Sequence, residues 1–207
     1  MIVLWGAVAH ATTLTFDGNI CGGACSNYSQ IDQTYGDIAG QLDVQYAGRT
    51  SSSVNNYLSW WDTGYNDLVN VAFGPSGGGV GEIALIPTAG FQVTLNSFDL
   101  GAWLNTTGTS QYTIYDSNYA FLGSSAGVIA VGSGTTTHSH YDIGLTNVNG
   151  LILQWGPDAY NVGIDNVNFT VQAISTPVPE SSSLLLLGLG LVGLAAWQWK
   201  RQGTTHG

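Results

Sequence analysis

The sequence predicts a single antiparallel β-sandwich followed by one apolar C-terminal helix. Short stretches rich in β-branched and aromatic residues recur at intervals of roughly 8–15 residues, and Gly, Asn, Asp and Ser lie between them. Charged residues make up only 8% of the 207 residues, against about 25% in an ordinary soluble domain. No stretch between residues 12 and 170 has the pattern of a long amphipathic helix. These observations favour an all-β domain.

Strands are predicted wherever strand-forming residues are flanked by turn residues. In sequence order the predicted strands are residues 13–16, 42–47, 57–61, 68–73, 82–86, 92–100, 111–115, 128–131, 138–143, 151–155 and 162–171. In the stretch 68–73, Val69, Val71 and Phe73 are expected on one face, because side chains alternate along a strand. The sandwich domain is therefore predicted to span residues 12–172.

The charge balance excludes several classes of protein. The chain has 13 acidic and 3 basic residues. All acids except Glu180 lie between residues 12 and 176, where Arg49 is the only base. Such a domain repels phosphate, so we expect no nucleic-acid partner. A hydrophobic content of 44% and an aromatic content of 11% exclude a disordered chain.

The N-terminus predicts export. Residues 2–9 are apolar, and Ala9-His10-Ala11 has the small-x-small pattern of a signal-peptidase site. We therefore expect residues 1–11 to be a signal peptide, so that signal peptidase leaves Thr12 as the mature start. No basic residue precedes the apolar run. A truncated start and a buried first strand remain alternatives.

The C-terminus predicts a membrane anchor. Residues 184–199 are almost wholly apolar, which gives about 24 Å of helix at about 1.5 Å per residue. Trp197 and Trp199 lie where interfacial aromatic residues are common, and Lys200 and Arg201 follow at once. The positive-inside rule then places the tail, residues 200–207, in the cytoplasm and the sandwich outside. A buried apolar helix of a soluble domain is the alternative.

The segment before this helix carries a motif. Residues 173–183 form a Pro/Ser-rich linker that contains Val178-Pro179-Glu180. The order of linker, Pro-Glu, short Leu/Gly-rich span and basic pair resembles the PEP-CTERM sorting domain, with Ser181 in place of the second proline of the signature. The resemblance implies a Gram-negative host and processing of the membrane anchor by an exosortase-type enzyme after export. It also implies a place at the cell surface or outside the cell, in company with exopolysaccharide.

The last predicted strand carries a second resemblance. Ile164-Asp165-Asn166-Val167 resembles the closing strand of galactose-binding-like jelly-roll carbohydrate-binding modules. This resemblance selects a jelly roll over an immunoglobulin-like sandwich.

Cys21 and Cys25 are the only cysteines, separated by Gly22-Gly23-Ala24. Outside the cytoplasm we expect them to form a disulfide, which for so short a loop stabilises the fold by about 2 kcal/mol. Free thiols and a metal site are the alternatives.

Two groups of side chains are candidate metal ligands. Asp17 and Asp165 lie near the first and last strands and, with backbone carbonyls, could hold a structural calcium ion. The alternative is an Asx turn at one end and a surface acid at the other. His138, His140 and Asp142 share one strand face, where they form either a metal site or a solvated polar surface. Apart from this calcium ion, no cofactor is predicted.

Trp60 and Trp61 are adjacent, so on a strand they face opposite sides and only one belongs to the core. Tyr57 and Trp61 share the side opposite Trp60, and Asp62 and Tyr65 follow. Exposed rings beside polar side chains suit a sugar, which stacks on an aromatic face and hydrogen-bonds through its hydroxyls. Tyr57, Trp61, Asp62 and Tyr65 are therefore candidate ligand residues, and packing of Trp61 under a loop is the alternative.

The sequence shows no sign of catalysis. Glu82 is the only Glu between residues 12 and 176, and no nucleophile elbow or catalytic triad stands out. We therefore expect a non-catalytic, exported surface or matrix protein whose sandwich binds polysaccharide. The alternatives are a purely structural surface protein and a secreted glycan hydrolase.

Overall fold

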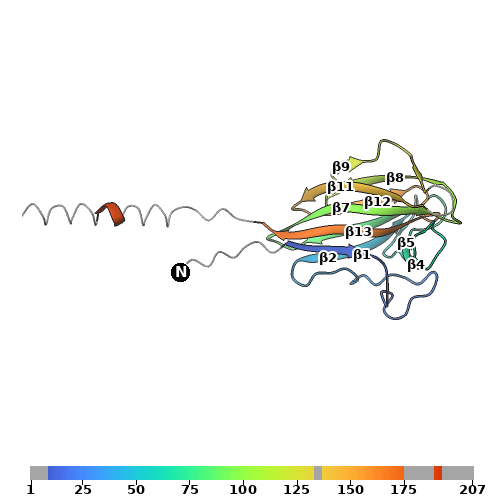
Figure 1. The fold of residues 1–207 in the computed structure, drawn as a ribbon, viewed down its shortest axis with the longest axis horizontal. Coiled ribbons are helices and arrows are strands. Elements are labelled where there is room, and N and C mark those ends of the chain that lie inside the picture. The colour runs from blue at the N-terminus through green and yellow to red at the C-terminus, as the bar shows by residue number, and fades with distance from the viewer. Residues whose placement is uncertain (1–8, 133–136, 175–188, 193–207) are drawn as a thin grey trace, which may run out of the picture. The chain divides into compact units, whose positions relative to one another are not determined.

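A computed structural model describes residues 9–132, 137–174 and 189–192. In these residues the chain forms an all-β domain of two antiparallel sheets (Figure 1). The described residues up to 174 form one compact unit, and the C-terminal segment from residue 175 is divided from it. The predicted β-sandwich is therefore confirmed, and the body is consistent with a jelly-roll-like arrangement.

The first sheet has the order β11-β7-β13-β5-β4, and β1 also pairs with β13. Its strands are β1 (Ala9–Leu14), β4 (Ser59–Trp61), β5 (Val71–Phe73), β7 (Phe91–Ala102), β11 (Ser139–Asn147) and β13 (Val162–Ala173). The second sheet has the order β10-β8-β12-β6-β2-β3, and β9 also pairs with β8. Its strands are β2 (Leu42–Arg49), β3 (Val54–Asn55), β6 (Val80–Pro87), β8 (Gly108–Tyr115), β9 (Phe121–Ser124), β10 (Ile129–Val131) and β12 (Leu151–Gly156).

The main core lies between the two sheets and is filled by alternate residues of their strands. In β2, Leu42, Val44 and Tyr46 are buried while Asp43 and Gln45 are exposed. The same two-residue period therefore produces both the packed interior and the polar outer surface.

Every predicted strand overlaps an observed one, but several boundaries differ, and two predictions fail at residues with positive φ. The prediction 68–73 fails before Val71, because Asn70 has a φ of 62° and ends the extended conformation. Val69 is accordingly 53% exposed and does not share a face with Phe73. The prediction 13–16 runs past the end of β1, since Phe16 has a φ of 52°. Sequence analysis also missed the short strands β3 and β9.

The predicted signal peptide overlaps β1, whose residues Ala9–Leu14 pair with β13. Ala9, His10 and Ala11 are exposed there, whereas Leu14 is buried in the core. Cleavage after Ala11 would therefore leave the buried end of the strand in place. Residues 1–8 lie outside the described residues, and the signal peptide stays a prediction.

The helix predicted for residues 184–199 falls mostly on residues outside the described set. Leu189–Val192, the part that is described, is helical. Among the residues that the structure describes, no helix is long and apolar enough to cross a membrane.

Cys21 and Cys25 form the predicted disulfide, with their Cα atoms 5.3 Å apart. Both half-cystines are partly buried against the main core. The loop that follows is thereby held close to the sandwich.

Gly81 provides a test of the packing between β6 and β12. It lies directly opposite Trp155, and a Cβ atom at residue 81 would lie 2.3 Å from the buried indole. We therefore expect Gly81→Ala to lower the free energy of unfolding by about 1–3 kcal/mol, measured by denaturant melts. Gly123→Ala in β9 is the matched control, because a Cβ atom there meets nothing within 4 Å. Equal stability of the two variants would contradict this packing.

Candidate functional site

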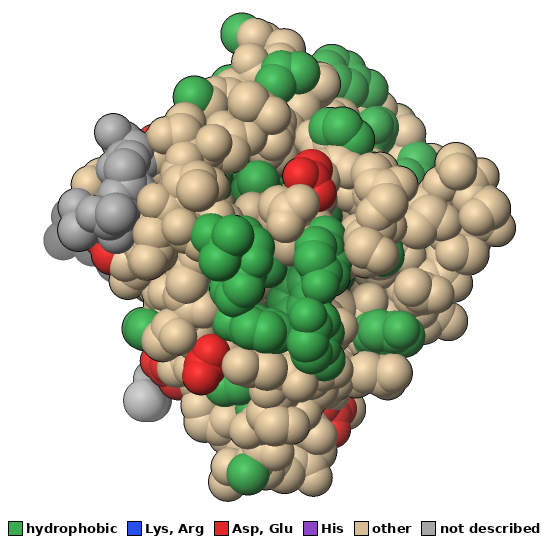
Figure 2. All heavy atoms as spheres, turned by 90° about the vertical axis from the view of Figure 1, so that its right-hand side faces the viewer, with side chains coloured by type: hydrophobic (Ala, Val, Ile, Leu, Met, Phe, Trp, Pro, Cys, Tyr) green, Lys and Arg blue, Asp and Glu red, His purple; other side chains and the backbone are tan. Residues whose placement is uncertain are grey.

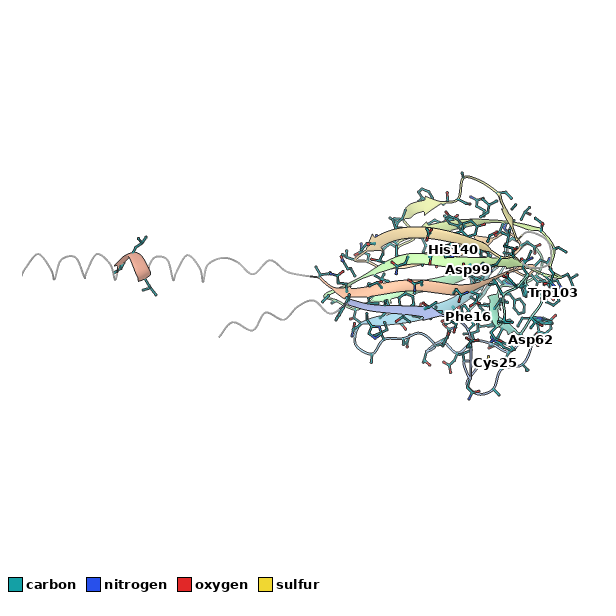
Figure 3. All side chains as sticks on the ribbon, in the orientation of Figure 1. Phe16, Cys25, Asp62, Asp99, Trp103 and His140 are labelled. Atoms are coloured by element: carbon teal, nitrogen blue, oxygen red, sulfur yellow. A yellow bond between two sulfur atoms is a disulfide. The ribbon has the colours of Figure 1, made fainter. Side chains whose placement is uncertain are left out.

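Six aromatic side chains gather at one end of the sandwich (Figure 2). We call this group the aromatic patch; its members are Tyr28, Trp61, Tyr65, Phe73, Trp103 and Tyr160. Trp103 and Asp62 lie at this end of the domain in Figure 3. Tyr65 and Phe73 also belong to a small buried cluster that is separate from the main core.

The alternation of β4 divides its two tryptophans between the core and the patch. Trp60 is 9% exposed, packs in the main core and donates a hydrogen bond from Nε1 to the carbonyl oxygen of Phe16 at 2.9 Å. Trp61 points the other way and is half-buried. Its ring lies 4.9 Å from the rings of both Tyr28 and Trp103. The predicted opposite orientation of this pair is confirmed.

Loops far apart in the sequence complete the patch. The amide of Tyr28 donates to the carbonyl of Trp60 at 2.9 Å, which fixes the loop that follows the disulfide. The hydroxyls of Tyr28 and Tyr160 lie 3.0 Å apart, and the hydroxyl of Tyr65 donates to the carbonyl of Tyr160 at 2.7 Å. The hydrogen bond with Tyr28 raises the pKa of Tyr160, and burial raises that of Tyr65. Both phenols therefore stay protonated at neutral pH.

The four predicted ligand residues have different environments. Trp61 lines the patch, but Tyr65 is only 3% exposed and serves as its inner wall. Asp62 is exposed, and its Oδ1 accepts the amide of Thr63 at 2.7 Å. Tyr57 lies in an adjoining groove. Sequence analysis missed Tyr28, Phe73, Trp103 and Tyr160.

The patch encloses a small hollow and borders a larger groove. The hollow has a volume of about 40 Å³ and is lined by the six rings. The groove has a volume of about 240 Å³, and we call it the tyrosine groove because Tyr28, Tyr57 and Tyr160 line it. Its other lining residues are Asn55, Ser59, Phe73, Gly74, Pro75 and Ser76. Since Tyr28, Phe73 and Tyr160 line both spaces, the hollow and the groove share a wall.

A second groove of about 480 Å³ lies on the outer face of the second sheet. Arg49 donates to both carboxylate oxygens of Glu82, from Nε at 2.6 Å and Nη2 at 2.7 Å. Gln154 and the hydroxyl of Tyr119 also donate to Glu82, at 2.6 and 2.9 Å. Burial acts to raise the pKa of Glu82, but these hydrogen bonds outweigh it and the pKa is lowered. The base of this groove is thus a neutralised ion pair.

The predicted histidine cluster is engaged with acids. The Nδ1 atom of His140 lies 2.5 Å from Oδ1 of Asp99, and this contact raises the pKa of His140. Figure 3 shows the two residues side by side on β11 and β7. The Nδ1 atom of His138 lies 3.0 Å from Oδ1 of Asp67. These contacts tie the His138–Asp142 segment to neighbouring acids.

Asp17 and Asp165 are brought near each other, as the calcium hypothesis requires. Burial, with the negative charges of Asp17 and Asp99, raises the pKa of Asp165 to about 8. Asn70 donates a hydrogen bond to Oδ1 of Asp17. The described residues contain no group of three or more His, Cys, Asp or Glu side chains placed to hold a metal ion. The calcium site stays a prediction that needs backbone carbonyls for its remaining ligands.

The fold and the C-terminal segment together define an all-β domain joined to a sorting segment. Residues 175–201 match the PEP-CTERM protein-sorting motif. The motif indicates an exported protein that is sorted through its C-terminal segment, in association with the membrane and an exosortase. It also favours a non-enzymatic surface protein over an enzyme.

No curated protein matches the sequence. Among solved structures, a similar one is the arabinose-bound MgGH51 α-L-arabinofuranosidase, with 11% sequence identity and a TM-score of 0.38. The match covers 77% of this chain and 26% of the enzyme, so the chain spans about a quarter of that protein's length. At this level of similarity, the match carries no argument about function.

The Arg49–Glu82 pair predicts how stability depends on pH. Because the folded-state pKa of Glu82 is lowered, the pair stabilises the protein above the ordinary pKa of 4.5 and loses its effect as pH falls through the lower folded value. We expect Glu82→Gln to cost about 2 kcal/mol at pH 7 and less below pH ~4. Denaturant melts between pH 3 and 8 measure both values. Asp43→Asn, an exposed change on the same sheet face, is the control, and a pH-independent loss in Glu82→Gln would contradict the assignment.

Proposed function

We propose that the protein is exported, held in the membrane by residues 184–199 and sorted to the cell surface, where its sandwich binds a neutral polysaccharide. The tyrosine groove is the observation that carries this proposal. Three tyrosines line it together with amide and hydroxyl side chains. Rings that stack on a sugar face, next to groups that hydrogen-bond its hydroxyls, are the requirements of glycan binding.

The charge of the protein supports a neutral ligand. Among the residues that the structure describes, no Lys, Arg, Asp or Glu lines the tyrosine groove. The formal net charge of −10 opposes the approach of an acidic polysaccharide. With a volume of about 240 Å³, the groove has room for one or two sugar rings of a glycan but not for a longer stretch of the polymer. A neutral glycan therefore fits better than a uronic acid polymer.

Polysaccharide binding can be measured by native affinity electrophoresis of the full chain in a polyoxyethylene detergent, which carries neither sugar nor ammonium. We expect neutral polymers such as xylan, galactomannan or β-glucan to slow migration, and alginate to have no effect. Tyr57→Ala should weaken binding about fivefold, since a ring contact contributes about 1 kcal/mol. Trp61→Ala should also weaken polysaccharide binding, because Trp61 packs against Tyr28 and Phe73, which line the groove.

The controls separate this site from others on the domain. Tyr115→Ala removes a half-buried tyrosine of the second sheet and should bind as the wild type does. Ala47→Trp fills the outer-face groove, which Ala47 lines; weaker binding in this variant alone would place the glycan there and contradict our site. If no polysaccharide slows the protein, the purely structural alternative holds. Release of reducing sugar from the same polymers would support the hydrolase alternative.

Sorting through residues 175–201 gives a separate prediction. Replacing Pro179 and Glu180 with Ala removes the part of the motif that the processing enzyme would recognise. We expect the variant to accumulate as the uncleaved chain in the membrane fraction, while the wild type reaches the cell surface or medium in shortened form. Cell fractionation with antibodies against the sandwich measures the difference. Full-length protein dissolved in the cytosol in both cases would contradict export.

A further inference from the structure

The hollow within the aromatic patch differs in kind from the tyrosine groove beside it. All of its lining residues are aromatic, namely Tyr28, Trp61, Tyr65, Phe73, Trp103 and Tyr160. In Figure 2 the hydrophobic side chains surround a depression at the centre of this end of the domain, and acidic side chains lie beside them. The hollow is therefore a defined space rather than a flat surface.

The angles between neighbouring rings show that they form walls. The ring of Trp61 meets the rings of Tyr28 and Trp103 at 85° and 83°. The rings of Phe73 and Tyr160 meet at 79°. The ring of Tyr65 is instead stacked on that of Phe73 at 29°, so the hollow is lined by ring edges and ring faces from several sides rather than by one flat platform.

The size of the hollow selects a small group. A volume of about 40 Å³ has room for about three water molecules, because each needs about 10–15 Å³ by the same measure. A sugar ring is larger than this, but a trimethylammonium group is comparable in size. The hollow thus fits one compact methylated group.

The hydroxyl groups around the hollow offer acceptors more than donors. The proton of Tyr65 is donated to the carbonyl of Tyr160, and one further proton is used between the hydroxyls of Tyr28 and Tyr160. Two of the three phenolic protons are therefore already committed, while oxygen lone pairs remain. This arrangement disfavours an anion and favours a positively charged group.

The surrounding charges act in the same direction. The exposed Asp62 follows Trp61 directly, and the negative charge of Asp158 acts on Tyr65. Arg49, the only base between residues 12 and 176, is paired with Glu82 in the other groove. A cation that approaches the hollow therefore meets an attractive field and aromatic faces, which bind quaternary ammonium groups through cation–π interactions.

We propose that the aromatic patch is a cage for a quaternary ammonium group. The proposal does not require the polysaccharide site, because the tyrosine groove is a separate space with polar lining residues. The same chemistry occurs in small solutes such as choline and in the headgroup of phosphatidylcholine. Both would enter the hollow with the methylated nitrogen first.

The test is calorimetric titration of the full chain, in the same polyoxyethylene detergent, with choline and with tetramethylammonium. We expect both cations to bind, and we expect the neutral isostere 3,3-dimethylbutan-1-ol to bind at least tenfold more weakly than choline. Trp103→Leu removes one wall and should weaken choline binding about tenfold. Tyr115→Leu, a half-buried ring on the other sheet, is the matched control and should leave it unchanged.

Three outcomes would overturn the proposal: no binding of choline, equal binding of the neutral isostere, or equal weakening by Trp103→Leu and Tyr115→Leu. Soluble headgroup analogues distinguish the sources of the ammonium group, because the proposed membrane anchor would hold the full chain on vesicles of any composition. Tighter binding of glycerophosphocholine than of choline, weakened in Trp103→Leu, supports the cage with a lipid headgroup. Tighter binding of choline than of glycerophosphocholine supports the cage with a free solute. If Tyr57→Ala loses glycan binding but still binds choline, the glycan site and the ammonium cage are independent of each other.

Discussion

The alternation of side chains along β4 is the constraint on which both the core and the aromatic patch depend. Trp60 enters the main core, where its indole donates to the backbone of Phe16. Trp61 must then face outward, where Tyr28 and Trp103 pack against it. A shift of register by one residue would exchange the two rings and lose both environments at once. The site is therefore built on the same pairing, between β4 and β5, that closes this edge of the first sheet.

The strands could be predicted where apolar and polar residues alternate regularly. The prediction failed where a single residue leaves the extended backbone conformation. The long strands β7 and β13 follow closely from their sequence patterns. The prediction failed at Asn70 and Phe16, since both adopt positive φ values that side-chain pattern does not reveal. Tertiary contacts explain these conformations: the amide of Asn70 donates to the carbonyl of Asp62, and that of Phe16 to the hydroxyl of Tyr35. A local pattern carries no information on such contacts.

The candidate site was predictable only in part for the same reason. The predicted strand 57–61 puts Tyr57 and Trp61 on the side opposite Trp60, but β4 begins only at Ser59, and Tyr57 lines the adjoining groove instead. Tyr28 and Tyr160 come from loops 132 residues apart, and only the folded sheets bring their hydroxyls together. Tyr65 was predicted to be exposed, but its ring packs inward over Phe73. The sequence predicts an open aromatic platform, whereas the structure has an enclosed hollow with a groove beside it.

The disulfide connects the compartment of the protein to the geometry of this site. The loop between Ile20 and Ile31 is anchored at both ends by these buried side chains, and the Cys21–Cys25 bond shortens its free part. Tyr28 lies in that free part with a φ of 71°, a conformation that a tyrosine adopts only when its surroundings hold it. An oxidising compartment keeps the bond formed. Export therefore also affects the geometry of the site. The disulfide formed outside the cytoplasm restricts the loop that carries Tyr28, and the ring of Tyr28 lines both the hollow and the groove.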